Sequence, residues 1–135
     1  MPLPPAADIR LEVSATGESA EAGLRLSNEM GEDVLIGVGG SPLELFVDRR
    51  RSRAARFHED YAGRHAGPVR AIDGRVHLRL IVDRSMVELF ANDGETVVSD
   101  RVFPTQPFTR IEPVNAARIV GSVDLWPLRP VWPGR

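Results

Sequence analysis

The sequence predicts an all-β fold in which two antiparallel sheets pack face to face as a sandwich. Apolar residues recur at every second position in several short segments, which is the spacing of one face of a β-strand. The 12 Gly and 11 Pro are spread through the 135 residues and leave few long windows for helices. An Asn-Asp-Gly turn also joins two β-rich segments, which is a strong local signal for a hairpin.

The first half of the chain contains four segments that predict strands. Apolar and polar residues alternate in the first, second and fourth of them, and the third is a short apolar run that fits a strand with two covered faces. These segments are 9–13, 24–26, 34–38 and 43–47. The cluster Gly37, Gly39 and Gly40 is followed by another strand rather than a helix, so it predicts a bend or bulge and not a phosphate-binding loop.

The second half continues the same pattern. Residues 76–82 alternate strongly, and Met86 to Phe103 predicts a hairpin around Asn92-Asp93-Gly94. Residues 51–75 are polar and read as one long connection, and 108–112 and 118–126 predict closing strands separated by Pro113. We expect one domain over residues 1–135, with 127–135 as a Pro-rich tail.

Composition excludes several classes of function. The net charge is −2 and all 17 basic residues are Arg, with no basic segment that would bind nucleic acid. No apolar run is long enough for a membrane span, and the first residues lack the pattern of a secretion signal. Cytoplasmic and secreted parents therefore both stay open. The absence of Cys excludes disulfides and zinc sites built on sulfur, and no cofactor is expected.

No catalytic or metal site is predicted. A glycosidase needs two carboxyl groups about 5 Å apart, or about 6.5–9.5 Å apart, depending on its mechanism. Asp83 and Glu88 qualify by residue type alone, and acids on exposed strands and turns are common. His58, His65 and His77 lack the spacing of metal ligands.

One aromatic and imidazole cluster falls in the long connection. Phe57, His58, Tyr61 and His65 lie within a short stretch of it. Long connections often have a binding role, so these side chains are candidates for contact with a partner domain or a sugar. The other interpretation is that they hold the connection against the sandwich.

Two stretches carry a resemblance to a known family. LRLIVDRSMVELFANDGETVVSDRVFP, residues 78–104, resembles the signature of the C-terminal module of the family 32 glycoside hydrolases. LELFVDRRRSRAARFHEDYAGRHAGPV, residues 43–69, is similar to the segment that precedes it in that family. The resemblance implies structural roles for Asp48, Arg49, Asp83, Arg84, Ser85, Glu88, Phe90, Asn92, Asp93 and Gly94.

The resemblance implies a jelly-roll-like sandwich of the concanavalin and galectin kind, joined in the parent enzyme to a five-bladed propeller that holds the active site. Family members include levanases, fructan β-fructosidases, invertases and sucrose-6-phosphate hydrolases. The family's three acidic motifs do not occur here, since Asn92-Asp93 is followed by Gly94 and neither Arg-Asp-Pro nor Glu-Cys is present.

The chain is therefore expected to be a non-catalytic module of a fructan- or sucrose-cleaving enzyme. Its expected partner is the propeller, with fructan or sucrose contact and homodimer formation as further options. The alternative is a stand-alone, lectin-like carbohydrate-binding module.

Overall fold

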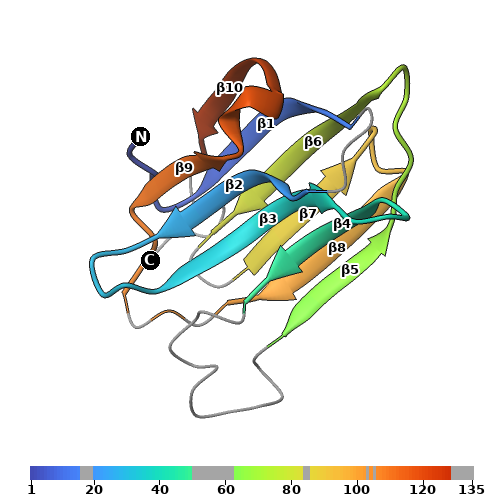
Figure 1. Ribbon diagram of the computed structural model, residues 1–135. Helices are drawn as coiled ribbons and strands as arrows, with labels where there is room; N and C mark the ends of the chain where they lie inside the picture. Colours follow the sequence, from blue (N-terminus) through green and yellow to red (C-terminus); the bar gives the residue numbers. More distant parts are fainter. Residues whose placement is uncertain (16–19, 50–62, 84–85, 103, 105, 129–135) are drawn as a thin grey trace.

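The protein is a sandwich of two five-stranded antiparallel sheets, as shown by a computed structural model (Figure 1). The structure describes residues 1–15, 20–49, 63–83, 86–102, 104 and 106–128. No helix within these ranges is long and apolar enough to cross a membrane. The predicted all-β sandwich is confirmed.

We call the two layers sheet A and sheet B. Sheet A has the order β5-β4-β3-β2-β9 and sheet B the order β10-β1-β6-β7-β8. The strands of sheet A are β2 (Ala22–Ser27), β3 (Asp33–Gly39), β4 (Glu44–Asp48), β5 (Arg64–Pro68) and β9 (Arg110–Val114). Those of sheet B are β1 (Ala7–Ser14), β6 (Arg75–Val82), β7 (Met86–Ala91), β8 (Thr96–Arg101) and β10 (Ile119–Pro127), the last preceded by a short 3-10 turn, η2 (Ala116–Arg118).

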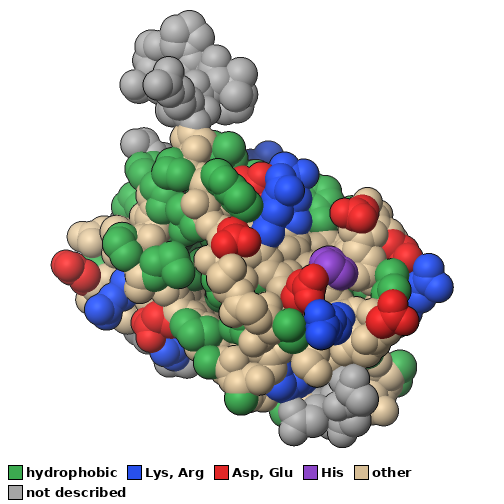
Figure 2. Space-filling model, turned by 90° about the horizontal axis from the view of Figure 1, so that it is seen from above, with side chains coloured by type: hydrophobic (Ala, Val, Ile, Leu, Met, Phe, Trp, Pro, Cys, Tyr) green, Lys and Arg blue, Asp and Glu red, His purple; other side chains and the backbone are tan. Residues whose placement is uncertain are grey.

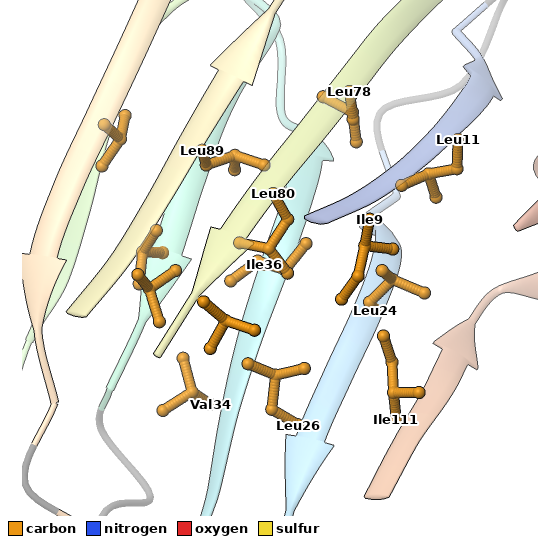
Figure 3. Close-up of a cluster of buried hydrophobic side chains, with 14 of the residues drawn as sticks. Ile9, Leu11, Leu24, Leu26, Val34, Ile36, Leu78, Leu80, Leu89 and Ile111 are labelled. Carbon is orange, nitrogen blue, oxygen red and sulfur yellow. The ribbon is translucent and has the colours of Figure 1, made fainter. Parts of the chain in front are cut away.

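The core lies between the two inner faces (Figure 3). Ile9 and Leu80 from sheet B and Leu24 and Ile36 from sheet A are at most 1% exposed. Ile9, Leu24 and Leu80 stand at the alternating positions that the sequence predicts, because successive residues of a strand point to opposite faces. Ile36 belongs to the apolar run of residues 34–38. Burying one large apolar side chain stabilises the fold by about 1.5–3 kcal/mol, so the period-two pattern specifies which face turns inward.

The structure corrects two sequence-based expectations about regular elements. Residues 64–68, expected to be part of a long connection, form β5 and pair with β4 from Asp48↔Arg64 to Glu44↔Pro68. Pro113, expected to separate the last two strands, lies inside β9 opposite Leu24. Both β5 and β9 are edge strands, where a proline without an N–H group is tolerated.

The glycine cluster also differs from expectation. Gly37 lies within β3, while Gly40 has φ 91° in the turn that follows. Gly37 has φ 156°, and a Cβ on it would stand 2.1 Å from the carbonyl oxygen of Ala22 on β2. The close approach of two strands, rather than a bend alone, thus requires glycine here. In the predicted tail, Pro127 is the last residue of β10, and residues 129–135 lie outside the described part.

Candidate functional site

The β6–β7 turn uses Asp83 as the sequence predicts. The Met86 N–H donates to Asp83 Oδ1 at 2.9 Å, and the Asp83 N–H donates to the Met86 carbonyl at 3.0 Å. A carboxylate that accepts backbone N–H groups fixes a tight turn. Arg84 and Ser85 of the same motif lie outside the described residues.

The Asn92-Asp93-Gly94 turn connects β7 and β8, which confirms the predicted hairpin. All three residues have positive φ, at 52°, 60° and 92°, a conformation that Asn, Asp and Gly adopt most readily. The Asn92 side chain accepts the His77 N–H at 3.1 Å and donates to the Arg70 carbonyl at 2.8 Å. Asn92 therefore holds the turn against β6 and against the segment that precedes β6.

A buried ion cluster joins the two sheets at the β4, β5 and β8 edge. The Arg49 guanidinium lies 3.1 Å from Asp100 Oδ1 and donates to the Arg101 carbonyl at 2.8 Å. His65 Nδ1 lies 2.9 Å from Asp100 Oδ2. Arg49 and Asp100 are almost completely buried, whereas the His65 ring is about half exposed.

Burial raises the pKa of Asp100, and the positive charges of Arg49 and His65 oppose that rise. A carboxyl with a raised pKa is a candidate for acid–base chemistry. Within the described ranges, however, the groups facing it are an arginine and a histidine, not a second carboxyl group. The cluster is arranged to hold the sheets together.

Sequence reasoning missed Asp100, although its position carried a signal. Val98 and Asp100 share the inward face of β8, so an acid stands where the alternation requires a buried side chain. An inward acid in a strand predicts a buried partner. The sequence could not identify that partner, because Arg49 follows a strand of the other sheet.

Asp48, next to Arg49, lies in a second charged group on sheet A. It is buried, and its Oδ2 is 3.8 Å from Arg64 Nη1. Arg64 also contacts Glu21, and its guanidinium lies 4.0 Å from the centre of the Phe46 ring. The guanidinium thus covers an aromatic side chain that sits on the outer face of β4.

The predicted contact cluster is only partly within the described residues. His65 lies on β5, while Phe57, His58 and Tyr61 fall in the range 50–62, outside the described part. Glu88 and Phe90 both lie on the outer face of β7 and are half-buried. The structure therefore brings Phe90 and Asp93 to one surface and places His65 in the edge cluster.

A hollow with a volume of about 830 Å³ lies on the outer face of sheet B. Arg10 on β1, His77 and Arg79 on β6, Phe90 on β7 and Asp124 on β10 all line it. Its charged groups have lateral partners: both oxygens of Asp8 bind Arg79, at 3.1 and 2.9 Å.

Hydrogen bonding to Arg79 lowers the pKa of Asp8, and Arg10 adds to the effect against the cost of burial. Asp8 is therefore a carboxylate at neutral pH rather than a proton donor. Figure 2 shows acidic and basic side chains interspersed around one histidine. Within the described ranges, no group of three or more Asp, Glu or His side chains could hold a metal ion.

The chain is similar in sequence to two bacterial levanases. It matches the family model described as Glycosyl hydrolases family 32 C terminal over residues 4–127. It is 37% identical over 97 residues to a levanase of Bacillus sp. (strain L7) and 33% identical over 119 residues to a levanase of Bacillus subtilis (strain 168). These alignments cover 72% and 86% of this chain but only 10% and 18% of the levanases.

Solved structures show the same fold. An exo-inulinase from Aspergillus awamori matches with a TM-score of 0.83 and 27% identity, over 98% of this chain and 26% of that enzyme. A sucrose-6-phosphate hydrolase from Lactobacillus gasseri matches with a TM-score of 0.68 and 21% identity, over 93% of this chain and 25% of that one, which supports the fold alone. The family model spans nearly the whole sandwich, and the chain therefore belongs to glycosyl hydrolase family 32, as the C-terminal domain of that family.

Proposed function

We propose that this chain is a non-catalytic domain that supports the catalytic propeller of a fructan- or sucrose-cleaving hydrolase. The observation that carries the proposal is the match of residues 4–127 to the C-terminal region of the family, together with the small share of each levanase that the chain covers. We infer that the chemistry of such a levanase lies in the part of the enzyme that this chain does not cover.

The placement of the acids supports a non-catalytic role. Glycoside hydrolysis needs two carboxyl groups on either side of a sugar. Asp100 faces Arg49 and His65 inside the sandwich, and Asp8 is held by two arginines. Among the described residues, the acids with shifted pKa values are thus committed to cationic partners.

One surface feature supports contact with a second domain. Trp126 and Leu128, at the end of β10, are 48% and 41% exposed, and exposed apolar groups of this size favour a covering partner. We also assign Phe57, His58, Tyr61 and His65 to the contact with the propeller or with a bound sugar.

The test begins with fructose release from sucrose, inulin and levan by this chain alone, where we expect none above the buffer rate. The longer protein, meaning the proposed hydrolase that contains both this domain and the propeller, is then compared with a version lacking residues 4–127. The shortened protein should lose activity faster on heating. Hydrolysis by the isolated chain would contradict the proposal. Equal heat resistance of the longer protein and its shortened version would also contradict it.

A point variant separates support from catalysis. Arg49→Met weakens the buried cluster without touching an outer face. In the longer protein it should shorten the half-life at elevated temperature and leave kcat/KM unchanged at low temperature. A loss of kcat/KM in a fully folded sample would mean that this domain takes part in the reaction.

A further inference from the structure

The hollow on the outer face of sheet B is produced by an irregularity in the β1–β10 pairing. Arg10 pairs with Asp124 and Glu12 pairs with Val120, so the three residues 121–123 stand opposite one residue of β1. Gly121, at the start of this bulge, has φ 74°. A bulge bends the strand that carries it, and residues 120–122 of β10 form one wall of the hollow.

The opposite wall is the turn after β7. Asp93 and Gly94 line it, and the backbone of this turn is fixed through Asn92. The floor is made by outward residues of β1, β6 and β7. The hollow is therefore built on strands and a braced turn, the kind of rigid scaffold on which binding sites are most precise.

From this geometry we propose that the hollow binds a short segment of a neutral oligosaccharide, and specifically of a fructan chain. The fructan assignment rests on the proposed function, whereas the sugar assignment rests on the lining itself. The volume, about 830 Å³, is within the range of about 300–1,000 Å³ for small-molecule sites.

The charges of the lining fit a neutral ligand with hydroxyl groups. Arg10 and Arg79 supply two positive charges, and Glu12, Asp93 and Asp124 supply three negative ones. Their near balance disfavours a phosphate or another anion. A hydroxyl group both donates and accepts hydrogen bonds, so it can use guanidinium and carboxylate groups side by side.

The polar side chains are already oriented by one another. Glu12 lies 3.2 Å from Arg75 and 3.3 Å from His77. Asp8 uses two of the five guanidinium N–H groups of Arg79, which leaves three for other acceptors. Side chains that are held in place lose less entropy when a ligand binds.

Phe90 supplies the apolar surface that sugar binding requires. It is a half-buried aromatic side chain on β7 that lines the hollow. An aromatic ring offers a flat apolar face, against which the C–H groups of a sugar ring can pack. Polar groups on the floor and walls and one aromatic side chain on the floor are together suited to a carbohydrate.

The test is a titration of the ¹⁵N-labelled chain, followed by amide chemical shifts, with inulin-derived and levan-derived tetrasaccharides. Maltotetraose is the non-fructan control. We expect saturable shifts of the amides of residues 77–79, 90–94 and 120–122 with the fructans and much smaller ones with maltotetraose. Equal shifts with all three sugars would overturn the fructan assignment.

Three variants test the assignment to these residues. Phe90→Ser should weaken fructan binding by about fivefold, which is ~1 kcal/mol, and His77→Ala should weaken it as well. Met86→Ser is the matched control, because Met86 lies on the same strand and face, is also half-buried, and is outside the hollow. All three spectra must retain the dispersion of the folded chain.

Absence of any shift at the lining amides, or an unchanged affinity of both folded hollow variants, would refute the site. These outcomes leave the proposed support function untouched, because heat inactivation of the longer protein does not depend on sugar binding in the hollow. Conversely, if the isolated chain itself hydrolyses fructans, the support function fails even when the titration succeeds.

Discussion

Removing Arg49 from the buried cluster should strongly destabilise the sandwich. The side chains of Arg49 and Asp100 are 6% and 5% exposed, and their polar atoms are 3.1 Å apart. Replacing Arg49 by Met keeps much of the volume but leaves the Asp100 carboxylate without its arginine. The other side chain that contacts it is His65, whose ring is half exposed.

The expected loss follows from the burial of the pair. Removing one partner of a buried ion pair costs about 3–5 kcal/mol, because the other charge stays buried. The whole free energy of unfolding of a domain is about 5–15 kcal/mol. Arg49→Met should therefore remove about a fifth or more of the stability, measured as the free energy of urea unfolding at pH 7 by circular dichroism.

Arg25→Met is the matched control. The Arg25–Glu112 pair is 3.5 Å apart, and both side chains are about 40% exposed. Solvent screens such a surface pair, which is worth about 0–1 kcal/mol. If Arg25→Met and Arg49→Met lower the unfolding free energy equally, burial of the cluster is not the source of its stability.

Three further predictions concern the charged groups and the β7–β8 turn. The pKa of Asp8 is lowered in the folded state, so the stability that Asp8 contributes is present above the unfolded pKa of about 3.8 and is lost as pH falls through the folded pKa. Asp8→Asn should therefore reduce the loss of unfolding free energy between pH 5 and pH 2, measured by urea unfolding at each pH. The charge of His65 opposes the raised pKa of Asp100, so His65→Ala should raise that pKa further in a ¹³C carboxyl NMR titration, and an unchanged value would refute the contact. Asn92→Ala removes two side-chain hydrogen bonds and places alanine, which has no polar side chain, at φ 52°. It should lower the free energy of urea unfolding by about 2–3 kcal/mol, and Asn92→Gly by about 1 kcal/mol less, because glycine adopts positive φ without strain.

The strands with one buried face were predictable from sequence. In β6, Val76, Leu78, Leu80 and Val82 are all at most 2% exposed, and the residues between them face outward. The pattern is reliable here because a one-residue slip would turn every apolar side chain of the strand to water. The Asn92-Asp93-Gly94 turn was predictable for a different reason, because these residue types readily adopt the positive φ angles that the turn requires.

The edge strand β5 escaped prediction because little of its surface is buried. In β5, His65, Ala66 and Pro68 are exposed, and Arg64 and Gly67 are half-buried. This strand is held by backbone pairing with β4. Such pairing does not require apolar and polar side chains to alternate along the strand. Alternation reports burial and not hydrogen bonding, so an exposed edge strand resembles a connection.

The candidate sites were less predictable than the fold, since each joins elements that are far apart in sequence. Asp100 was visible as an inward acid, yet its partners lie on the other sheet. The hollow depends on a register shift between β1 and β10 and on the conformation of Gly121. Neither feature follows from residue types in a single segment.

The packing of the sandwich limits where this domain can act on anything else. Side chains from both sheets fill the space between the inner faces, so no ligand can enter there without displacing core residues (Figure 3). Contacts with sugar or with a catalytic domain must therefore use the outer faces, the edges or the connections. Outer-face substitutions such as His77→Ala change those surfaces without removing a core side chain. The two proposals can thus be tested separately, because the proposed sugar site lies on the outer face of sheet B, whereas Arg49→Met changes only the buried cluster that ties β4 and β5 to β8.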